Sequence, residues 1–370
     1  MNTKGMLMLR IVVNDGVAVP GAGGVYSVLK DFEKMIGAYS SDPIEWIFIL
    51  SGPFVQERDH VKVIQLPKLK SSKLYRLGFD FLWGRRFINQ LDPDIYISFQ
   101  NTATLGVHAK QFVYLHQPLN YVMDIHKFSF LNQRERKLAI YQRIFGPIIN
   151  LLIRFANANV IVQTEWLKKI LVKRNIQSSQ KITVISPTVF VTNKKIRQRP
   201  DNFFYPATPM IYKNHRTLID VCRILSEKGI NSFRIFLTIT EQDLRELSGA
   251  ENIPFQIKCL GSIERSKVYK LMEESVLLFP SSIETFGLPL LEAKNMGTEI
   301  FSANIGPARE ILENYDNVEF FEVGNSAQLA ELMKSWLNKD IPIKFQQTDE
   351  NIHEQPQNVA DFLVKEGNNR

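Results

Sequence analysis

Two glutamates eight residues apart, Glu284 and Glu292, have the clearest potential for chemistry in this sequence. The segment that contains them, 280–293, follows the short apolar run 276–279, which predicts a buried strand. Pro289 lies between the two glutamates, and proline suits the first position of a helix. We therefore predict a strand, a loop and a helix in that order. In α/β proteins such a junction, at the carboxyl edge of the sheet, is the usual place for a bound ligand.

The spacing of the two carboxylates argues against paired acid–base catalysis. On a single helix, eight residues advance about 800°, so the side chains would lie about 80° apart and roughly 12 Å along the axis. With Pro289 at the helix start, Glu284 lies in the loop and Glu292 in the first turns. Gly287 allows the backbone to approach a ligand, and the N–H groups of a helix start favour an anion such as phosphate. The alternative is an ordinary junction with solvated carboxylates.

Three other features lie where predicted strands end. Gly23 and Gly24 follow the first strand and precede a helical pattern, which suits a phosphate-bearing ligand close to the backbone; a flexible turn is the alternative. His116 closes a predicted strand at 112–115, although a lone histidine is more often structural. Lys213 lies in a loop after a strand of the carboxyl half and could bind phosphate, although most loop lysines are solvated.

The chain of 370 residues is longer than one typical core supports, so two domains are expected. Apolar strand-like runs alternate with segments of helical period, which predicts an α/β fold with parallel, doubly wound sheets. We place one domain at 1–190, a second at 191–345, and a tail at 346–370 with a short helix from 359 to 364 that can return to the first domain. Strands are predicted at 9–13, 44–50, 61–66, 94–99, 112–115, 160–162, 182–185, 203–205, 233–237, 255–260, 276–279, 300–301 and 318–321.

Composition is ordinary for a globular protein, with 45% hydrophobic and 22% charged residues. The net charge of +7 is uneven: residues 1–180 contain 23 Lys and Arg against 13 Asp and Glu (+10), and residues 181–370 contain 22 against 25 (−3). Cys222 and Cys259 lie in apolar segments without ligand spacing, which favours buried thiols in a reducing compartment over a metal site. No secretory signal and no apolar run of 18 residues is found, so no membrane-spanning segment is expected.

Two stretches of the amino half, 68–87 and 128–155, combine Lys and Arg with Trp, Phe and Leu. Basic amphipathic segments of this kind suit an anionic membrane surface. Nucleic acid is a competing partner, but no nucleic-acid-binding motif accompanies the charge, so none is expected to bind. A solvated helix face is the remaining alternative.

Taken together, these residues resemble the retaining glycosyltransferases of family 4, which have the two-domain GT-B fold. The most specific match is that family's signature of two glutamates separated by seven residues, here Glu284 to Glu292. The resemblance implies two Rossmann-like domains that face each other across a donor-binding cleft, with residues 1–190 on the acceptor side and residues 191–345 binding the nucleotide sugar. Further matches extend over nearly the whole chain: Gly23-Gly24, His116-Gln117, 163–169, Tyr205-Pro206-Ala207, Lys213-Asn214, Leu260-Gly261, Pro280-Ser281 and Gly297.

The resemblance also implies a role for each candidate residue. Glu292 would hold the ribose hydroxyls of a nucleotide sugar, and Glu284 would lie near the donor sugar. Lys213 would neutralise the diphosphate leaving group without a metal, since a cation and helix-start amides can stabilise the developing charge. His116 would contact sugar hydroxyls near the anomeric carbon. The implied catalytic residues are therefore His116, Glu284 and Lys213, and the implied donor-binding residues are Gly23, Gly24, Lys213, Phe286, Gly287, Leu288 and Glu292.

The sequence departs from the family in one place. Many relatives carry a Gly-Arg pair after the first strand of the second domain, and its arginine joins the lysine on the diphosphate. The corresponding stretch here, 205–208, is Tyr-Pro-Ala-Thr and contains no arginine. Phosphate binding must then depend on Lys213, the glycines and a residue that the sequence does not identify.

The likeness is closest to bacterial enzymes that build O-antigen, lipopolysaccharide or capsule on a lipid carrier. It implies a hexosyltransferase that uses a nucleotide sugar, with UDP preferred over GDP or dTDP, and a lipid-linked saccharide acceptor. It also implies a cytoplasmic protein, peripheral on the inner face of the cell membrane. Two alternatives stay open: a non-catalytic GT-B subunit or nucleotide-sugar-binding protein, and a sugar-nucleotide epimerase of similar fold.

Overall fold

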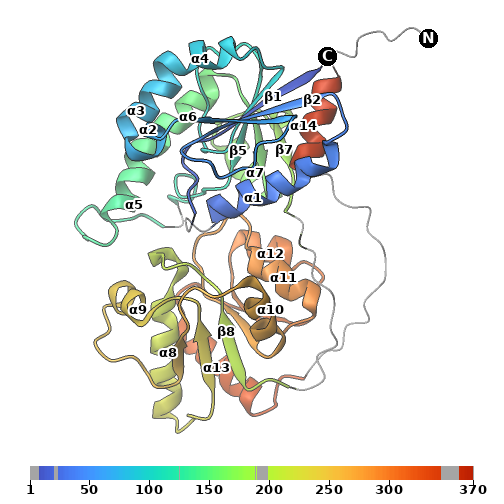
Figure 1. Ribbon diagram of the computed structural model, residues 1–370. Coiled ribbons are helices and arrows are strands. Elements are labelled where there is room, and N and C mark those ends of the chain that lie inside the picture. The colour runs from blue at the N-terminus through green and yellow to red at the C-terminus, as the bar shows by residue number, and fades with distance from the viewer. Residues whose placement is uncertain are drawn as a thin grey trace. The chain divides into compact units, whose positions relative to one another are not determined.

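The computed structural model describes residues 8–20, 24–124, 126–187, 189, 199–342 and 358–369. The described residues form two compact units (Figure 1). Unit 1 takes its residues from Met1–Phe128, Leu138–Thr188 and His353–Arg370, and unit 2 from Ser129–Lys137 and Val189–Ile352. The predicted domain boundary at residue 190 and most of the predicted tail lie outside the described residues.

Unit 1 contains a seven-stranded parallel sheet of order β3-β2-β1-β4-β5-β6-β7. Every strand predicted for the amino half is confirmed, with ends that shift by up to two residues. The strands are β1 (Leu9–Asp15), β2 (Ile44–Leu50), β3 (Val61–Gln65), β4 (Ile95–Ser98), β5 (Lys110–Leu115), β6 (Asn159–Val162) and β7 (Ile182–Val184).

Unit 2 contains a six-stranded parallel sheet of order β10-β9-β8-β11-β12-β13. The strands predicted for the carboxyl half are likewise confirmed. They are β8 (Asn202–Tyr205), β9 (Arg234–Leu237), β10 (Ile257–Cys259), β11 (Val276–Phe279), β12 (Ile300–Ala303) and β13 (Val318–Phe321).

The central strands form because they are predominantly apolar runs. Every residue of β2, β4, β11 and β12 is buried, the pattern of a parallel sheet covered by helices on both faces. The helices are amphipathic: α8 buries Leu218, Val221, Cys222 and Leu225, spaced by three or four residues, on one face. Full burial of one such aliphatic side chain contributes about 1.5–3 kcal/mol. Each unit thus has its own hydrophobic core.

The helices that accompany the first sheet include α14 from the carboxyl end of the chain. Its Val359, Ala360 and Leu363 belong to the core cluster of unit 1, and Figure 1 shows it in red beside this sheet. A Cβ on Gly367 would lie 2.5 Å from Leu9 Cδ1, so glycine permits the close packing of α14 on β1. The helices up to residue 188, and α14, are α1 (Gly24–Ile36), α2 (Lys68–Ser71), α3 (Lys73–Gly78), α4 (Gly84–Gln90), α5 (Arg136–Ile140), α6 (Gly146–Phe155), α7 (Glu165–Lys173) and α14 (Val359–Asn368).

Six helices accompany the described strands of unit 2. They are α8 (His215–Glu227), α9 (Glu241–Ser248), α10 (Arg265–Glu273), α11 (Leu288–Met296), α12 (Gly306–Ile311) and α13 (Ser326–Leu337). Trp336 of α13 is buried, and its ring packs 3.6 Å from the guanidinium carbon of Arg199. Arg199 also donates to the carbonyl oxygens of Trp336 and Ile341, which anchors the start of the described part of unit 2.

Both sheets reverse their strand order at one internal point. In unit 1 the reversal falls between β1 and β4, and in unit 2 between β8 and β11. Two doubly wound, Rossmann-like units are therefore confirmed. Loops that leave neighbouring strands in opposite directions open a crevice at such a switch point, and ligands bind there in open α/β sheets. A ligand site is therefore expected at two places: after β1 and β4 in unit 1, and after β8 and β11 in unit 2.

Candidate functional site

The loops after β8 and β11 meet through an ion pair at the switch point of unit 2. Lys213 Nζ lies 2.5 Å from Glu284 Oε1, and the two side chains are only 18% and 11% exposed. The sequence predicted both residues as candidates but not their pairing. The structure therefore brings together a cation and a carboxylate from loops 71 residues apart.

The backbone of these two loops is held together by hydroxyl groups. The buried Tyr205 hydroxyl, at the end of β8, donates to the carbonyl oxygen of Lys213 at 2.9 Å and lies 2.7 Å from Ser281 Oγ. Ser282 donates both its N–H and its hydroxyl to the carbonyl oxygen of Tyr212, at 2.9 and 3.0 Å. Tyr205 belongs to the stretch 205–208, where many relatives carry an arginine. Here it positions Lys213 by a hydrogen bond to the main chain of Lys213.

Helix α11 begins directly after this loop. Gly287 precedes it with φ of +114°, a conformation that L side chains rarely adopt, and Leu288 is its first residue. Pro289 is therefore the second helical residue, one later than predicted. The Phe286 side chain is buried in the core of unit 2, so only its main chain can meet a ligand. The helix start lies beside the loop of Glu284, where its first N–H groups lack intrahelical partners.

Glu292 is 7% exposed and lies one turn into α11. Its Oε1 accepts hydrogen bonds from the Arg265 guanidinium at 2.9 Å and from the Tyr269 hydroxyl at 3.1 Å. Arg265 and Tyr269 are four residues apart on α10, and the guanidinium also donates to the tyrosine hydroxyl. Each glutamate of the predicted pair therefore holds one cation, Lys213 for Glu284 and Arg265 for Glu292.

His116 follows β5 in unit 1 and is fixed by Asn101, which follows β4. Asn101 Oδ1 accepts the main-chain N–H groups of His116 at 2.7 Å and Gln117 at 3.0 Å. These two donors fix the orientation of the amide, so Asn101 Nδ2 must donate to His116 Nε2, 3.2 Å away. Burial lowers the pKa of His116 to about 4. The ring is therefore neutral at physiological pH, with its proton on Nδ1.

The glycine cluster after β1 is described only in part. Gly23 lies outside the described residues, and Gly24 is the first residue of α1.

Asp15, the last residue of β1, was not predicted as a site residue. It is fully buried, neither carboxylate oxygen has a hydrogen-bond partner among the described residues, and burial raises its pKa well above the usual value. The carboxyl edge of β1 thus carries a buried acid.

His215, the first residue of α8, follows Lys213 by two positions and is 1% exposed. Its ring lies 5.1 Å from the Tyr205 ring, and neither ring nitrogen has a hydrogen-bond partner among the described residues. Burial, together with the nearby charge of Lys213, lowers its pKa to about 3. The imidazole is therefore held neutral beneath the loop that carries Lys213.

A pH-dependent loss of stability should follow from His215. Its pKa is lower in the folded chain than the ordinary value of about 6.5, so the unfolded chain binds more protons below that pH and stability falls on acidification. Between pH 6.5 and 5 the loss is about 1.5 kcal/mol, because the unfolded imidazole is half protonated at pH 6.5 and the slope approaches its full 1.36 kcal/mol per pH unit only near pH 5. We expect the urea midpoint of His215→Phe to fall less than that of the wild type over this range. The exposed His108, as His108→Phe, is the control, and equal pH dependence in all three proteins would contradict the prediction.

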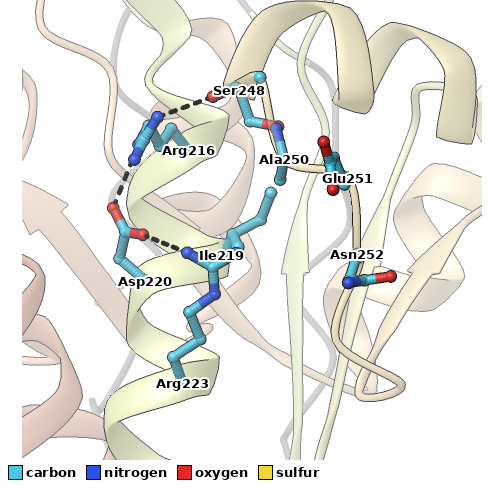
Figure 2. A pocket seen from close by; sticks show the side chains of 9 residues that line it. Arg216, Ile219, Asp220, Arg223, Ser248, Ala250, Glu251 and Asn252 are labelled. Carbon is cyan, nitrogen blue, oxygen red and sulfur yellow. Dashed lines mark hydrogen bonds and ion pairs between the residues drawn. The ribbon is translucent and has the colours of Figure 1, made fainter.

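A shallow depression of about 250 Å³ lies on unit 2 between α8 and residues 248–252 (Figure 2). Arg216 donates to the carbonyl oxygen of Ser248 at 2.8 Å, and Asp220 lies 3.6 Å from Arg216 and 3.5 Å from Arg223. Both arginines are at least half exposed and share one carboxylate, so they form a surface ion network. None of the predicted site residues lines this depression.

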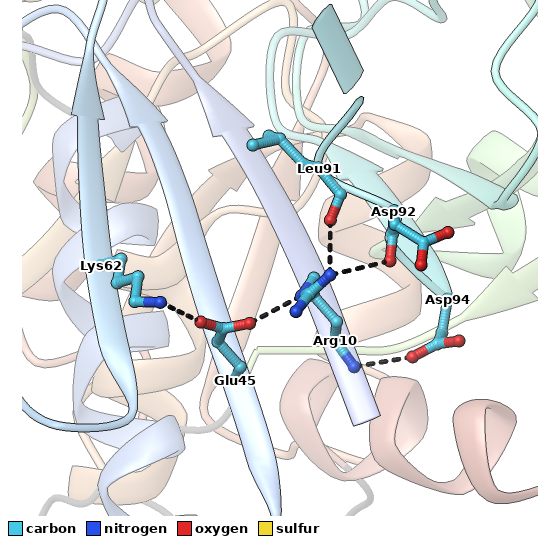
Figure 3. Close-up of polar contacts among 6 residues, drawn as sticks. All are labelled: Arg10, Glu45, Lys62, Leu91, Asp92 and Asp94. Carbon is cyan, nitrogen blue, oxygen red and sulfur yellow. Dashed lines mark hydrogen bonds and ion pairs between the residues drawn. The ribbon is translucent and has the colours of Figure 1, made fainter. Parts of the chain in front are cut away.

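A second polar cluster joins the first three strands of unit 1 (Figure 3). Glu45 on β2 accepts from Arg10 on β1 at 2.6 Å and from Lys62 on β3, and these contacts hold its pKa below the usual value. Arg10 also donates to the carbonyl oxygen of Leu91 at 2.9 Å. Since Arg10 and Glu45 are each the second residue of a strand, the cluster lies at the amino edge, opposite to the ligand edge. Its role is to hold the strands in register.

The sequence identified the candidate residues but not the side chains that position them. It did not identify Tyr205 as a positioning residue, Asn101 as the partner of His116, or Arg265 and Tyr269 as the partners of Glu292. Of these, only Arg265 and Tyr269 could have been found from the sequence, because side chains four residues apart lie on one face of a helix. Among the described residues, no group of three or more His, Cys, Asp or Glu side chains could hold a metal ion.

The chain resembles known proteins in part of its sequence and in its fold. The family model described as "Glycosyl transferases group 1" matches residues 192–355, a little under half of the chain and most of unit 2. No curated protein matches the sequence.

Many solved structures have a similar fold, and three of them illustrate it. The first is WaaG, "a glycosyltransferase involved in lipopolysaccharide biosynthesis": TM-score 0.64, 13% identity, 89% of this chain and 91% of WaaG covered. The second is sucrose-phosphate synthase from Thermosynechococcus elongatus, with TM-score 0.64, 13% identity, and 89% and 90% covered. The third is HepE of Anabaena in complex with UDP-glucose, with TM-score 0.58, 16% identity, and 90% of each chain covered. At these identities the similarity shows the fold, two Rossmann-like units of the GT-B type.

Proposed function

We propose that the protein is a retaining glycosyltransferase that moves a sugar from a nucleotide-sugar donor to a lipid-linked glycan. The observation that carries the proposal is the Lys213–Glu284 pair at the switch point of unit 2, with Glu292 eight residues further on in α11. This pair lies in the segment that matches the glycosyltransferase family model. HepE, of similar fold, was solved with UDP-glucose, which supports a nucleotide-sugar donor with UDP preferred over GDP or dTDP.

The proposed chemistry follows from charge. Breaking the bond between a sugar and a diphosphate leaves negative charge on the leaving group, and preorganised positive groups stabilise that charge. In this proposal Lys213 neutralises the diphosphate, and the main chain of residues 286–288 meets the sugar and the phosphates at the start of α11. Glu284 holds Lys213 in place and lies near the donor sugar, and Glu292 accepts from the ribose hydroxyls. No step requires a metal.

Unit 1 supplies the other part of the proposed reaction. His116, neutral and fixed by Asn101, is proposed to contact hydroxyls of the donor sugar near the anomeric carbon. Gly23 and Gly24 are proposed to approach the diphosphate. Retention of anomeric configuration comes from the resemblance to family 4 and is part of the same proposal.

The proposed acceptor is a lipid-linked glycan of bacterial O-antigen, lipopolysaccharide or capsule synthesis, met at the inner face of the cell membrane. WaaG, of similar fold, is described as acting in lipopolysaccharide biosynthesis. Unit 1 also exposes large apolar side chains among basic ones on α3, α6 and the turns beside them. The apolar ones are Leu74, Leu82, Ile144, Leu151 and Phe155, and basic neighbours in sequence are Lys73, Arg76, Arg143 and Arg154.

The helical stretch Arg136–Phe155, within the described residues, is long and apolar enough to cross a membrane by length and composition alone, and 28% of its apolar window is buried. Two of its residues, one polar and one small, are nevertheless packed into unit 1. Gln142 is buried and donates to the carbonyl oxygens of Leu119 and His126, and a Cβ on Gly146 would lie 2.4 Å from Asn120 Cβ. Because these contacts pack the stretch into unit 1, we propose that it lies on the membrane surface with Leu151 and Phe155 towards lipid.

The membrane contact predicts an effect for Phe155→Glu. The substitution removes an exposed apolar side chain and adds a negative charge, so binding to vesicles of phosphatidylcholine and phosphatidylglycerol should fall about tenfold or more. Phe255→Glu, at an exposed phenylalanine of unit 2, is the matched control and should bind as the wild type does. Co-sedimentation measures both, and wild-type binding should weaken as salt is added. Equal loss in the two variants, or binding that ignores salt and lipid charge, would contradict the contact.

Titration with UDP, GDP and dTDP, followed by assays with the matching nucleotide sugars, tests the proposed function itself. We expect one nucleotide to bind and its sugar to be transferred or slowly released to water. Binding without turnover on any acceptor would favour a non-catalytic subunit, and an isomerised donor without an acceptor would favour an epimerase. Failure to bind all three nucleotides would overturn the proposal.

A further inference from the structure

The loops after β8 and β11 supply little positive charge for a diphosphate. Two phosphate groups together carry about two or more negative charges at neutral pH. Lys213 brings one positive charge, and in the nucleotide-free structure it is already paired with Glu284. Residues 206–212 and 280–287 contain no other lysine and no arginine. A further donor of hydrogen bonds close to Lys213 is therefore needed to bind a diphosphate.

Helix α8 begins two residues after Lys213 and is 13 residues long. The first N–H groups of a helix lack intrahelical partners, and the helix dipole favours an anion beside them. Asn214 precedes α8 with φ of +60°, and its side chain makes no capping hydrogen bond. In contrast, the side chains of Thr240 and Asn325 cap the starts of α9 and α13. The start of α8 is thus free of a side-chain cap.

The first residue of α8, His215, adds a second and independent feature. It is 1% exposed, and neither ring nitrogen has a hydrogen-bond partner among the described residues. Buried polar side-chain atoms are hydrogen-bonded in the large majority of cases, so an unpaired one requires an explanation, such as a ligand that is absent. The pKa of about 3 keeps the imidazole neutral, and a neutral imidazole has one N–H group to donate. The described chain offers that donor no acceptor.

The surroundings of His215 connect it to Lys213. The Tyr205 ring lies 5.1 Å from the imidazole, and the Tyr205 hydroxyl donates to the carbonyl oxygen of Lys213, so one tyrosine positions both residues. The charge of Lys213 acts on His215 and, after burial, is the larger cause of its low pKa. Asp243 also acts on it, but this carboxylate already accepts the N–H and the hydroxyl of Thr240. An anion bound by Lys213 therefore lies in the neighbourhood of His215.

His215 is covered in the nucleotide-free structure, so a ligand reaches it only when the covering groups move. The loop 206–213 is the adjacent segment, and its residues 208–210 are exposed. This loop is attached to the rest of unit 2 by the Tyr205 hydroxyl and by Ser282, which donates to the carbonyl oxygen of Tyr212. A shift of the loop on ligand binding would open the start of α8.

We infer that His215 and the first N–H groups of α8 form a second binding point for the diphosphate, next to Lys213. His215 donates one hydrogen bond to a phosphate oxygen as a neutral group, and the helix start contributes partial positive charge. The inference rests on the proposed function, since it concerns the ligand of the same site. It assigns a donor to the region where the stretch 205–208 provides no arginine.

The first test compares a nucleoside diphosphate with its nucleoside, using full-length protein. UDP and uridine are the probes, or GDP or dTDP with its nucleoside if titration shows that one of these binds instead. A hydrogen bond to a charged group corresponds to about 10- to 100-fold in affinity, so His215→Phe should weaken UDP by that factor in calorimetric titration. Uridine affinity, from saturation-transfer NMR, should stay within twofold. His215→Gln, which keeps an N–H donor, should recover most of the UDP affinity, and the exposed His108→Phe should behave as the wild type does.

The second test asks whether His215 acts on the ligand or only through Lys213. The substitution His215→Phe is repeated in a Lys213→Ala background, and UDP binding is followed by saturation-transfer NMR. If His215 contacts the phosphate, its loss should weaken UDP at least fivefold further in this background. If His215 only holds the Lys213 loop in place, the double variant should bind UDP as Lys213→Ala alone does, which overturns the inference.

The outcomes separate this inference from the proposed function. If UDP binds and His215→Phe changes its affinity less than twofold, or weakens uridine as much as UDP, the second binding point is wrong and the Lys213 site stands. If His215→Gln is as weak as His215→Phe, a hydrogen bond from this position is excluded. If no nucleotide binds the wild type, the proposed function itself fails. Urea unfolding checks each variant, and His215→Leu replaces His215→Phe if the larger ring prevents folding.

Discussion

Replacement of Lys213 by alanine is expected to lower kcat for sugar transfer by about 10²–10³-fold, the usual effect of removing one preorganised group that stabilises developing negative charge. The charge of Lys213 lies in a site where its side chain is only 18% exposed, so water cannot replace it effectively. Its main chain is fixed by Tyr205, so little reorganisation is needed when the leaving group forms. Release of the nucleotide product, followed with the donor identified by titration, measures the effect.

Two variants make this result interpretable. Lys267→Ala removes an exposed lysine of the same unit and should retain full activity. Because Lys213→Ala leaves the Glu284 carboxylate without the lysine, part of any loss could reflect stability. The double variant Lys213→Ala, Glu284→Gln removes both charges and should recover stability but not kcat. Activity of Lys213→Ala within threefold of the wild type would mean that Lys213 does not act on the leaving group.

Glu292→Gln is expected to weaken UDP binding about 10²-fold. Two ribose hydroxyls that donate to a carboxylate contribute about 1.5–3 kcal/mol each, and every 1.4 kcal/mol is a factor of ten in affinity. In the nucleotide-free structure the carboxylate is buried and already aimed by Arg265 and Tyr269 through Oε1, so it is preorganised for a neutral polar ligand. Calorimetric titration with UDP gives the dissociation constant directly.

Titration with 2′,3′-dideoxy-UDP isolates the contact. The wild type should bind this analogue about as weakly as Glu292→Gln binds UDP, and the variant should not distinguish the two nucleotides. Glu264→Gln, at the exposed residue before α10, is the control and should retain the preference for UDP. If Glu292→Gln still discriminates between UDP and its dideoxy analogue as the wild type does, Glu292 does not contact the ribose.

Much of the fold follows from local sequence. Most strands of the two sheets are predicted because a parallel strand covered by helices on both faces is a largely apolar run, which few other elements of that length share. The run 276–279 followed by Gly287 and Pro289 was enough to place a loop and a helix start. The error at Pro289, one residue, is of the size that helix ends show in general.

The sequence also identified Glu284, Glu292, Lys213 and His116, because each stands at a strand-to-helix junction: His116 directly after β5, Lys213 and Glu284 in the loops after β8 and β11, and Glu292 one turn into α11. Such positions come together at the carboxyl edge of a parallel sheet whatever the order of its strands. Residue type and place in the local pattern were therefore sufficient to name them. The family-specific spacing of the two glutamates added their proposed roles.

What only the tertiary structure decided is which of these residues meet. Strand order places β8 beside β11 and β4 beside β5, and that order depends on long-range packing, which no local pattern encodes. It brings Lys213 to Glu284, Asn101 to His116, and α10 with Arg265 to Glu292. The sequence by itself determined the chemical groups and the elements that carry them, whereas the fold determined their pairing, burial and charge state.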